Sequence, residues 1–316
     1  MKRVVVTGAT GFLGRNLCET LLERGYYVIG IDNHLTGSES NILDHENYSF
    51  YEANIVKEDL SMLLRDHNRK GIHYIYNLAC PASPDHYKAH PFSTLEVCYN
   101  GTKNVIQYSM EQGKVRMLHA STSEVYGDPQ VEEQGETYWG NVNSYGPRAC
   151  YDEGKRVAEA LIYESIRKLN ANISIARIFN TYGPYMAIND GRVISNFITE
   201  GLKGNHLIIY GGGFQSRSFC YVDDTIEGLI RICESGFKEI FNVGNPDRYS
   251  ILEIAEVIAE KTDAPGWKND APSPDDPMHR KPNIKKIQEY LGWTPRINLN
   301  QGLDSTIEYF RNAIEG

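Results

Sequence analysis

The 316-residue chain lacks long apolar runs, blocks of basic residues and closely spaced cysteines. No uncharged apolar stretch approaches the ~18 residues of a membrane-spanning helix, and the stretch after the initial basic pair is too short for a signal peptide. Acidic residues outnumber basic ones, 41 against 32, for a formal net charge of −9. Because nucleic acids and membrane surfaces are polyanionic, we expect neither as a partner.

The cysteines are few, and no two of them form a CxxC motif. The six are Cys18, Cys80, Cys98, Cys150, Cys220 and Cys233. This spacing predicts no metal site and is typical of reduced thiols, so we expect a cytoplasmic protein. A hydrophobic content of 41% with 23% charged residues indicates a globular chain and excludes a disordered one.

The first 180 residues alternate between short apolar segments and segments with helical periodicity. Strands are expected at 3–7, 27–31, 48–51, 72–77, 115–119 and 173–178, and helices from 12 to just before 25, at 94–111 and at 150–169. Strands that alternate with helices imply a parallel sheet covered on both faces. The expected fold class is α/β, with a Rossmann-type doubly wound parallel sheet and a smaller C-terminal substrate-binding domain.

The elements become shorter beyond residue 180, which is where we place the domain boundary. Residues 1–180 then form the first domain and 181–316 mainly the second, with a segment near 223–245 packing back on the first. Expected in the second half are helices at 193–202, 223–234 and 250–261, a strand at 206–210 and a loose segment at 263–282. Ser250 and Glu253 form a capping-box signature that opens one of these helices.

A glycine-rich turn joins the first strand to the first helix. Gly8, Gly11 and Gly14 permit a tight turn, close approach of a pyrophosphate and close packing of the helix on the sheet. The helix N-terminus adds N–H groups and partial positive charge for the phosphates. Asp32, ending the second strand, is placed to bond an adenosine ribose and to repel a 2′-phosphate. A merely structural turn is the alternative, but this context favours a dinucleotide site that takes NAD rather than NADP.

A second motif places a tyrosine and a lysine on one helix face. Tyr151 and Lys155 are four residues, or about one turn, apart. A nearby ammonium, with a cationic nicotinamide, would favour the phenolate over the phenol. Thr122 follows an apolar strand, where doubly wound sheets place their ligands, and its hydroxyl would bond the phenol and a substrate alcohol. An ordinary amphipathic helix and a Ser/Thr turn are the alternatives. Together the motifs predict a proton-abstraction site of oxidoreductase type.

Longer segments carry a family resemblance. They are TGATGFLG (7–14), NLACPASPDHY (77–87), STSEVYGDP (121–129), YWGNVNSYGPRACYDEGKRVAE (138–159), ARIFNTYGP (176–184), DGRVISNFI (190–198), QSRSFCYVDD (215–224) and DDPMHRKPNI (275–284). Through them the chain resembles the extended short-chain dehydrogenase/reductases, the NAD-dependent epimerase/dehydratase family. Within that family it is most similar to the UDP-glucuronate decarboxylases.

The resemblance implies roles for individual residues. Those implied to hold NAD are Gly8, Gly11, Phe12, Leu13, Gly14, Asp32, Asn33, Thr36, Asn54, Ile55, Leu78, Ala79, Tyr151 and Lys155. Those implied to hold the UDP-sugar are Pro81, Asn180, Arg192, Asn196, Tyr210, Gln215, Arg217 and Arg280. Arg217 would neutralise the diphosphate. The resemblance also implies a homodimer, in which helices 94–111 and 150–169 of two subunits form a four-helix bundle.

Three reactions of this family begin by oxidising C4 of the sugar. A 4,6-dehydratase usually has an aspartate where this chain has Ser123, which cannot protonate a leaving hydroxyl at neutral pH. A 4-epimerase rarely keeps a carboxylate at the position of Glu124. Ser123, Glu124 and Arg280 match the decarboxylases, which must seat a carboxylate and reprotonate C5. Arg280 is alternatively a surface cation beside Asp275 and Asp276.

The resemblance therefore favours NAD-dependent decarboxylation of a UDP-sugar acid, UDP-glucuronate to UDP-xylose, with Thr122, Tyr151 and Lys155 at C4. A dehydratase, an epimerase, a decarboxylase that stops at the 4-keto sugar and a non-catalytic nucleotide-binding protein remain as alternatives. Three positions depart from the family pattern. Asn143–Gly146 reads Asn-Ser-Tyr-Gly where Asn-Pro-Ile-Gly is usual, Asn54 replaces an aspartate, and Cys98 replaces an asparagine.

Overall fold

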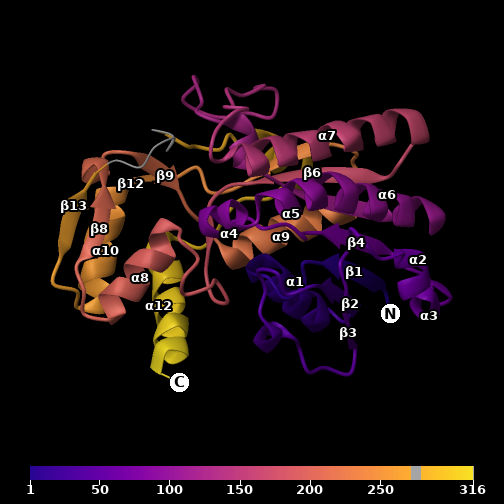
Figure 1. The fold of residues 1–316 in the computed structure, drawn as a ribbon, viewed down its shortest axis with the longest axis horizontal. Helices are drawn as coiled ribbons and strands as arrows, with labels where there is room; N and C mark the ends of the chain where they lie inside the picture. Colours follow the sequence, from indigo (N-terminus) through magenta and orange to yellow (C-terminus); the bar gives the residue numbers. More distant parts are fainter. Residues whose placement is uncertain (272–278, 316) are drawn as a thin grey trace.

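A seven-stranded parallel sheet lies at the centre of the computed structural model, which describes residues 1–271 and 279–315 (Figure 1). Its order is β11-β6-β5-β4-β1-β2-β3. The strands are β1 (Arg3–Thr7), β2 (Tyr27–Asp32), β3 (Tyr48–Glu52), β4 (Tyr74–Asn77), β5 (Arg116–Thr122), β6 (Ile173–Ile178) and β11 (Ile240–Val243). The order reverses between β1 and β4, where such sheets bind ligands. The prediction of a doubly wound α/β fold is confirmed.

Strand β1 explains why both faces of the sheet are covered. Side chains alternate along a strand, so Val4 and Val6 enter one apolar core and Val5 enters another. The first core lies under α1 (Phe12–Glu23) and α9 (Val222–Glu234). The second lies under α6 (Thr102–Glu111) and α7 (Ala149–Leu169), on the opposite face in Figure 1.

The second half of the chain forms smaller units beside this sheet, at the left of Figure 1. Its helices are α8 (Val193–Leu202), α10 (Ile251–Thr262), α11 (Lys285–Leu291) and α12 (Leu299–Glu315), and its strand pairs are β7–β10 (Thr181–Tyr182, Cys220–Tyr221), β8–β13 (Leu207–Tyr210, Trp267–Asp270) and β9–β12 (Ser216–Ser218, Arg248–Ser250). The remaining short helices are η1 (Glu39–Asn41), α2 (Leu60–Leu63), α3 (Arg65–Asn68), α4 (Pro84–Ala89), α5 (Pro91–Glu96), η2 (Val97–Gly101), η3 (Ser123–Tyr126) and η4 (Gly211–Gly213). The capping box predicted at Ser250 and Glu253 opens α10.

Two predicted elements are wrong in detail. Strand β5 does not stop at His119 but continues through Thr122, because β6 pairs with it as far as Ile178. The helix predicted at 94–111 is divided, since a π-helical segment, η2, separates α5 from α6. The first difference places Thr122 on the sheet itself rather than in a turn, and the second places Cys98 in a widened helical turn.

Elements on either side of residue 180 are in contact with each other. The predicted domain boundary at this residue stays a prediction. Strand β11 pairs with β6 in the central sheet, and α9 packs on the face it shares with α1. The segment expected to be loose, 263–282, contains β13, while residues 272–278, including Asp275 and Asp276, lie outside the described residues. Within the described ranges, no helix has both the length and the apolar character to cross a membrane.

Candidate active site

The glycine turn leaves room beside the first helix. Gly8 has a positive φ of 74°, and a Cβ there would lie 2.8 Å from the backbone nitrogen of Ala79. A Cβ on Gly14 would collide with the Gly8 carbonyl at 1.9 Å, so both positions require glycine. A Cβ on Gly11 would meet only that carbonyl, at 3.4 Å. Helix α1 has no side-chain cap and no acidic residue in its first turn. This cradle fits a pyrophosphate.

Asp32 and the loops beside it surround this turn. The Asp32 carboxylate accepts hydrogen bonds from the backbone nitrogens of Thr10 (3.0 Å) and His34 (2.9 Å), which fix its position at the end of β2. The Asn54 side-chain oxygen accepts a hydrogen bond from the Val56 nitrogen at 2.9 Å. The other residues predicted to bind NAD border the same strand ends: Phe12 and Leu13 on α1, Asn33 and Thr36 after β2, Ile55 after β3, and Leu78 and Ala79 after β4.

Tyr151, Lys155 and Thr122 meet at the carboxyl end of β5. The Lys155 ammonium donates to the Ala120 carbonyl at 2.7 Å and lies 5.9 Å from the centroid of the Tyr151 ring. The Thr122 side chain forms a hydrogen bond with that of Tyr151 and also accepts one from the Glu124 nitrogen at 3.2 Å. The structure therefore brings together the three residues predicted for proton abstraction.

The protein alone does not make Tyr151 a base. Burial raises the pKa of the Tyr151 phenol well above its ordinary value, and the charge of Cys80 acts in the same direction. The hydrogen bond with Thr122 opposes this rise. Since the Lys155 ammonium is bonded to a backbone carbonyl, the lower pKa that we expect requires the additional positive charge of an oxidised nicotinamide.

A buried ionic cluster adjoins this group. Arg280 donates through Nη1 to Ser123 Oγ (3.1 Å) and Glu124 Oε1 (2.7 Å), and through Nη2 to the Gly127 carbonyl (2.9 Å). Arg148 pairs with the other oxygen of Glu124. Arg280 is 2% exposed, and its Nε has no hydrogen-bond partner among the described residues. Arg280 is thus not a surface cation, and its Nε is a buried donor that the described residues leave without an acceptor.

The cluster keeps Glu124 ionised. Burial by itself raises the pKa of this carboxyl, but the charges of Arg280, Arg148 and Arg217 outweigh burial and hold the pKa below its ordinary value. Three cations therefore converge on one carboxylate.

The pKa of Asp152 is shifted in the opposite direction to that of Glu124. Its Oδ2 lies 4.0 Å from Arg148 Nε, and its buried Oδ1 has no hydrogen-bond partner within the described part of the chain. Burial raises the pKa of Asp152 to about 7, with the Glu124 charge adding to the rise and the Arg148 charge opposing it. The folded protein therefore holds this proton more tightly than the unfolded chain does.

We expect Asp152→Asn to become increasingly stabilising, relative to wild type, as the pH rises. The folded pKa of about 7 exceeds the ordinary value of 3.8, so stability is lost as the pH rises between those values, because the unfolded chain has released the proton that the folded protein still holds. An asparagine does not titrate. Melting temperatures between about pH 5 and about pH 8 measure the effect. Asp66→Asn, at an exposed site, is the control, and a pH-independent difference at Asp152 would contradict the assignment.

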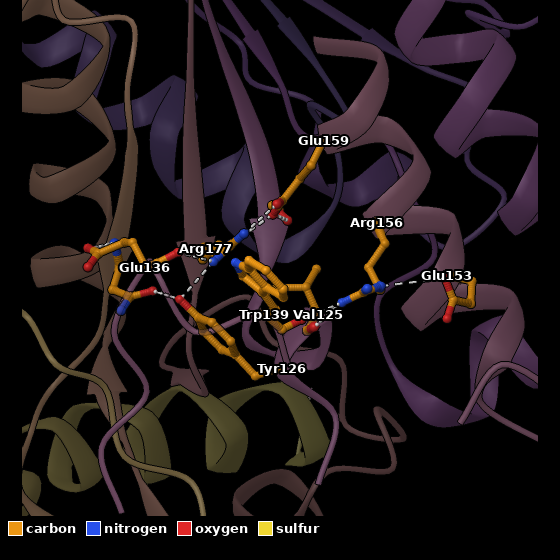
Figure 2. A network of polar contacts seen from close by, with 10 residues as sticks. Val125, Tyr126, Glu136, Trp139, Glu153, Arg156, Glu159 and Arg177 are labelled. Carbon is orange, nitrogen blue, oxygen red and sulfur yellow. Dashed lines mark hydrogen bonds and ion pairs between the residues drawn. The ribbon is translucent and has the colours of Figure 1, made fainter. Parts of the chain in front are cut away.

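A polar network in Figure 2 holds α7 against the strands. Arg177 on β6 forms a two-fold ion pair with Glu159 on α7 (2.6 and 3.0 Å), and Glu159 also accepts a hydrogen bond from Ser121 at 2.5 Å. Arg177 also donates a hydrogen bond to the Tyr126 hydroxyl at 3.0 Å. Arg156 bonds the carbonyls of Val125 and Trp139, both at 2.9 Å. The network fixes η3, and with it Ser123 and Glu124, relative to Tyr151.

Sequence reasoning assigned no role to the residues of this network or to Arg148. Their partners lie far along the chain, and each residue alone resembles an ordinary surface charge. The only local signal is the position of Glu159 and Arg156 on the same helix as Tyr151.

The residues predicted to hold a UDP-sugar fall into separate groups. Arg217 lies on β9, and the Arg280 nitrogen donates to the carbonyl of the adjacent Ser216 at 3.3 Å, so both arginines share this strand edge. Arg192 stands at the N-cap position of α8, pairs with Asp190 and lies 6.0 Å from the Phe12 ring centroid. Pro81 follows Cys80, and the Asn180 carbonyl accepts a hydrogen bond from the Cys220 nitrogen. Asn196 is exposed on α8. The Gln215 side chain donates a hydrogen bond to the Tyr210 carbonyl at 2.8 Å.

The fold and these geometries define a dinucleotide-dependent enzyme of the tyrosine–lysine type. The profile of the NAD dependent epimerase/dehydratase family matches residues 4–244. UDP-glucuronic acid decarboxylase 4 of Arabidopsis thaliana is 46% identical over 317 residues, which cover 99% of this chain and 70% of that protein. The chain belongs to the NAD dependent epimerase/dehydratase family, and its cofactor is NAD.

Solved structures agree with this assignment. A UDP-glucose 4-epimerase of Thermotoga maritima, crystallised with UDP-glucose, superimposes with a TM-score of 0.91 at 27% identity and 99% coverage of both chains. A UDP-glucuronic acid 4-epimerase of Bacillus cereus, in complex with UDP-glucuronic acid and NAD, gives a TM-score of 0.84 at 26% identity, covering 98% of this chain and 99% of that one.

Proposed function

We propose that the protein decarboxylates UDP-glucuronate to UDP-xylose. The observation that carries the proposal is the buried Arg280, bonded to Ser123 and Glu124 beside Thr122 and Tyr151, with its Nε left without an acceptor among the described residues. A guanidinium in that position suits a sugar carboxylate. The Arabidopsis relative, named for the decarboxylation of UDP-glucuronic acid, supports the same substrate.

When bound, NAD supplies the hydride acceptor and donor for C4 of the sugar. Tyr151 takes the proton of the C4 hydroxyl and later returns it, with Thr122 orienting the hydroxyl and Lys155 contributing positive charge. A C4 ketone makes the C6 carboxylate that of a β-keto acid. The C5–C6 bond then breaks, CO₂ leaves, and the electron pair moves toward the C4 oxygen held by Tyr151 and Thr122.

Arg280 and its partners act at the other end of the sugar. The Arg280 guanidinium seats the C6 carboxylate, while Ser123 and Glu124 hold the guanidinium and line the site in which C5 regains a proton. Arg217 neutralises part of the diphosphate charge, and Arg192, lying near Phe12, borders the NAD and sugar sites. The positions and charges of these side chains support the proposed roles.

The test is release of labelled CO₂ from UDP-glucuronate labelled at C6, with the products identified by mass. We expect labelled CO₂ and a UDP-pentose. Conversion of a neutral UDP-hexose to a 4-keto-6-deoxy sugar without CO₂ release would support a dehydratase instead. Interconversion of two UDP-hexoses would support an epimerase, and accumulation of a 4-keto pentose would indicate an enzyme that omits the final reduction.

We also propose a homodimer formed through α5, α6 and α7. Three side chains at helical spacing on α5 and η2 are exposed: Phe92 (84%), Leu95 (42%) and Tyr99 (43%). Tyr163 on the neighbouring α7 is 64% exposed. Apolar side chains gathered on adjoining helices are typical of an interface, and pairing two copies would form a four-helix bundle. The cytoplasmic location stays a prediction from the cysteine pattern.

Phe92→Asp combined with Tyr163→Asp is expected to convert the dimer to a monomer, because each substitution buries a charge in the paired surface. Light scattering at micromolar concentration gives the mass. Met62→Asp, at a 76% exposed position on α2, is the control and should leave the mass unchanged. A wild-type protein that is already monomeric would refute the dimer.

A further inference from the structure

Two cysteines that are distant in sequence meet beside the catalytic lysine. Cys80 follows β4, Cys98 lies in the π-helical segment η2, and their sulfur atoms are 3.5 Å apart. Cys98 is buried, whereas Cys80 is partly exposed. A Cβ on Gly154 of α7 would lie 3.1 Å from the Cys98 sulfur, so this glycine lets α7 press the Cys98 side chain toward Cys80.

The surroundings activate one sulfur of the pair. A hydrogen bond from Cys98 lowers the pKa of Cys80 to about 7; burial opposes this, and the charge and a hydrogen bond of Lys155 reinforce it. The pKa of Cys98 is raised, first because of the same hydrogen bond and then because of burial. Cys80 thus supplies a thiolate near neutral pH and Cys98 a neighbouring thiol, the arrangement found in oxidation-sensitive pairs.

We propose that Cys80 and Cys98 form an oxidative modification site, at which hydrogen peroxide converts the two thiols to a reversible disulfide beside Lys155. The Cys80 thiolate attacks one peroxide oxygen, and the O–O bond breaks to give a sulfenic acid and, after proton uptake, water. The Cys98 sulfur then attacks the Cys80 sulfur, an S–S bond forms, and a second water leaves. Two thiols are oxidised and one peroxide is reduced.

The disulfide would change the surroundings of Lys155 and the position of residues that border the glycine turn. Closing the gap from 3.5 Å to a bond of about 2.05 Å draws Cys80 toward η2 and removes the thiolate next to Lys155. Ala79 must follow its neighbour. Its nitrogen bonds Thr7 Oγ1 at 3.3 Å and lies against Gly8 in the glycine turn. Oxidation is therefore expected to weaken NAD binding.

The test compares reduced and peroxide-treated protein without measuring turnover. We expect a Cys80–Cys98 cross-linked peptide in a non-reducing digest, a protein mass lower by two hydrogens, and a loss of NAD affinity in calorimetry that dithiothreitol restores. Because none of these readouts depends on the sugar reaction, their failure is distinguishable from failure of the proposed decarboxylation.

Two variants separate this pair from other thiols. Cys98→Ser keeps the size of the side chain and should give no cross-link, leaving Cys80 oxidised alone. Cys150→Ser removes a third thiol, whose charge raises the pKa of Cys98 and whose own pKa is raised by the charge of Cys80. This variant should leave the Cys80–Cys98 cross-link intact. A cross-link through Cys150, or no cross-link at all, would overturn the site. A Cys80–Cys98 disulfide with unchanged NAD affinity would overturn its effect on the cofactor.

Discussion

Tyr151→Phe is expected to lower turnover of UDP-glucuronate about a thousandfold, within the range typical of lost acid–base catalysis. The substitution removes only the hydroxyl that takes the C4 proton. The ring remains stacked on Tyr87, with centroids 5.0 Å apart and planes 6° from parallel, so the fold should be preserved. Neither absorbance of reduced nicotinamide nor a 4-keto product should accumulate, because the first step of the reaction is lost.

Tyr87→Phe is the matched control. Tyr87 is equally buried against the same ring, and its hydroxyl has no hydrogen-bond partner among the described residues. Its loss should therefore cost far less turnover than the loss of the Tyr151 hydroxyl. A Tyr151→Phe enzyme within tenfold of wild type, or equal losses in both variants, would show that another group takes the proton.

Arg280→Ala is expected to slow release of CO₂ about a hundredfold or more, the usual scale for one preorganised charged contact. Some oxidation at C4 should survive, since Tyr151 and Thr122 remain in place. The variant should also melt at a lower temperature. Removing one partner of a buried ion pair costs about 3–5 kcal/mol, and here Arg148 remains beside Glu124 to reduce that cost.

Arg280→Lys and Glu124→Gln keep the prediction testable if the alanine variant fails to fold. The lysine keeps the positive charge but loses the planar fork, and the glutamine keeps the shape but loses the negative charge. Both should slow CO₂ release more than C4 oxidation. Lys281→Ala, which breaks only the neighbouring pair with Glu133 at 2.7 Å, should affect neither. Equal losses of both steps in the folded Arg280→Lys enzyme would contradict the assignment.

The parts of the site that follow from local spacing were predictable from the sequence. The turn of Gly8, Gly11 and Gly14 needs only a strand before it and a helix after it. Tyr151 and Lys155 need only helical periodicity. The boundary of β5 was wrong because Ser121 and Thr122 have little apolar character, and their strand conformation depends on pairing with β6.

The long-range contacts were not predictable in the same way. Glu159 and Arg177 lie on different elements and resemble solvent-exposed charges until the sheet brings them together (Figure 2). Cys80 and Cys98 meet because a widened helical turn approaches the end of β4, which no spacing rule describes. Arg280 was predicted only from the family resemblance, and its burial depends on the pairing of its backbone with β9.

Because of strand β11, the second half of the chain is difficult to replace by that of another protein. It lies beyond β6, at the edge of the central sheet, yet it is synthesised only after β7 to β10 and α9. A nascent or truncated chain that ends near residue 180 therefore presents β6 as a bare edge, and unpaired edges recruit other strands. Grafting a new sugar-binding half at residue 180 would remove a strand from the nucleotide-binding sheet. A functional junction must instead leave residues 240–243 with the first half.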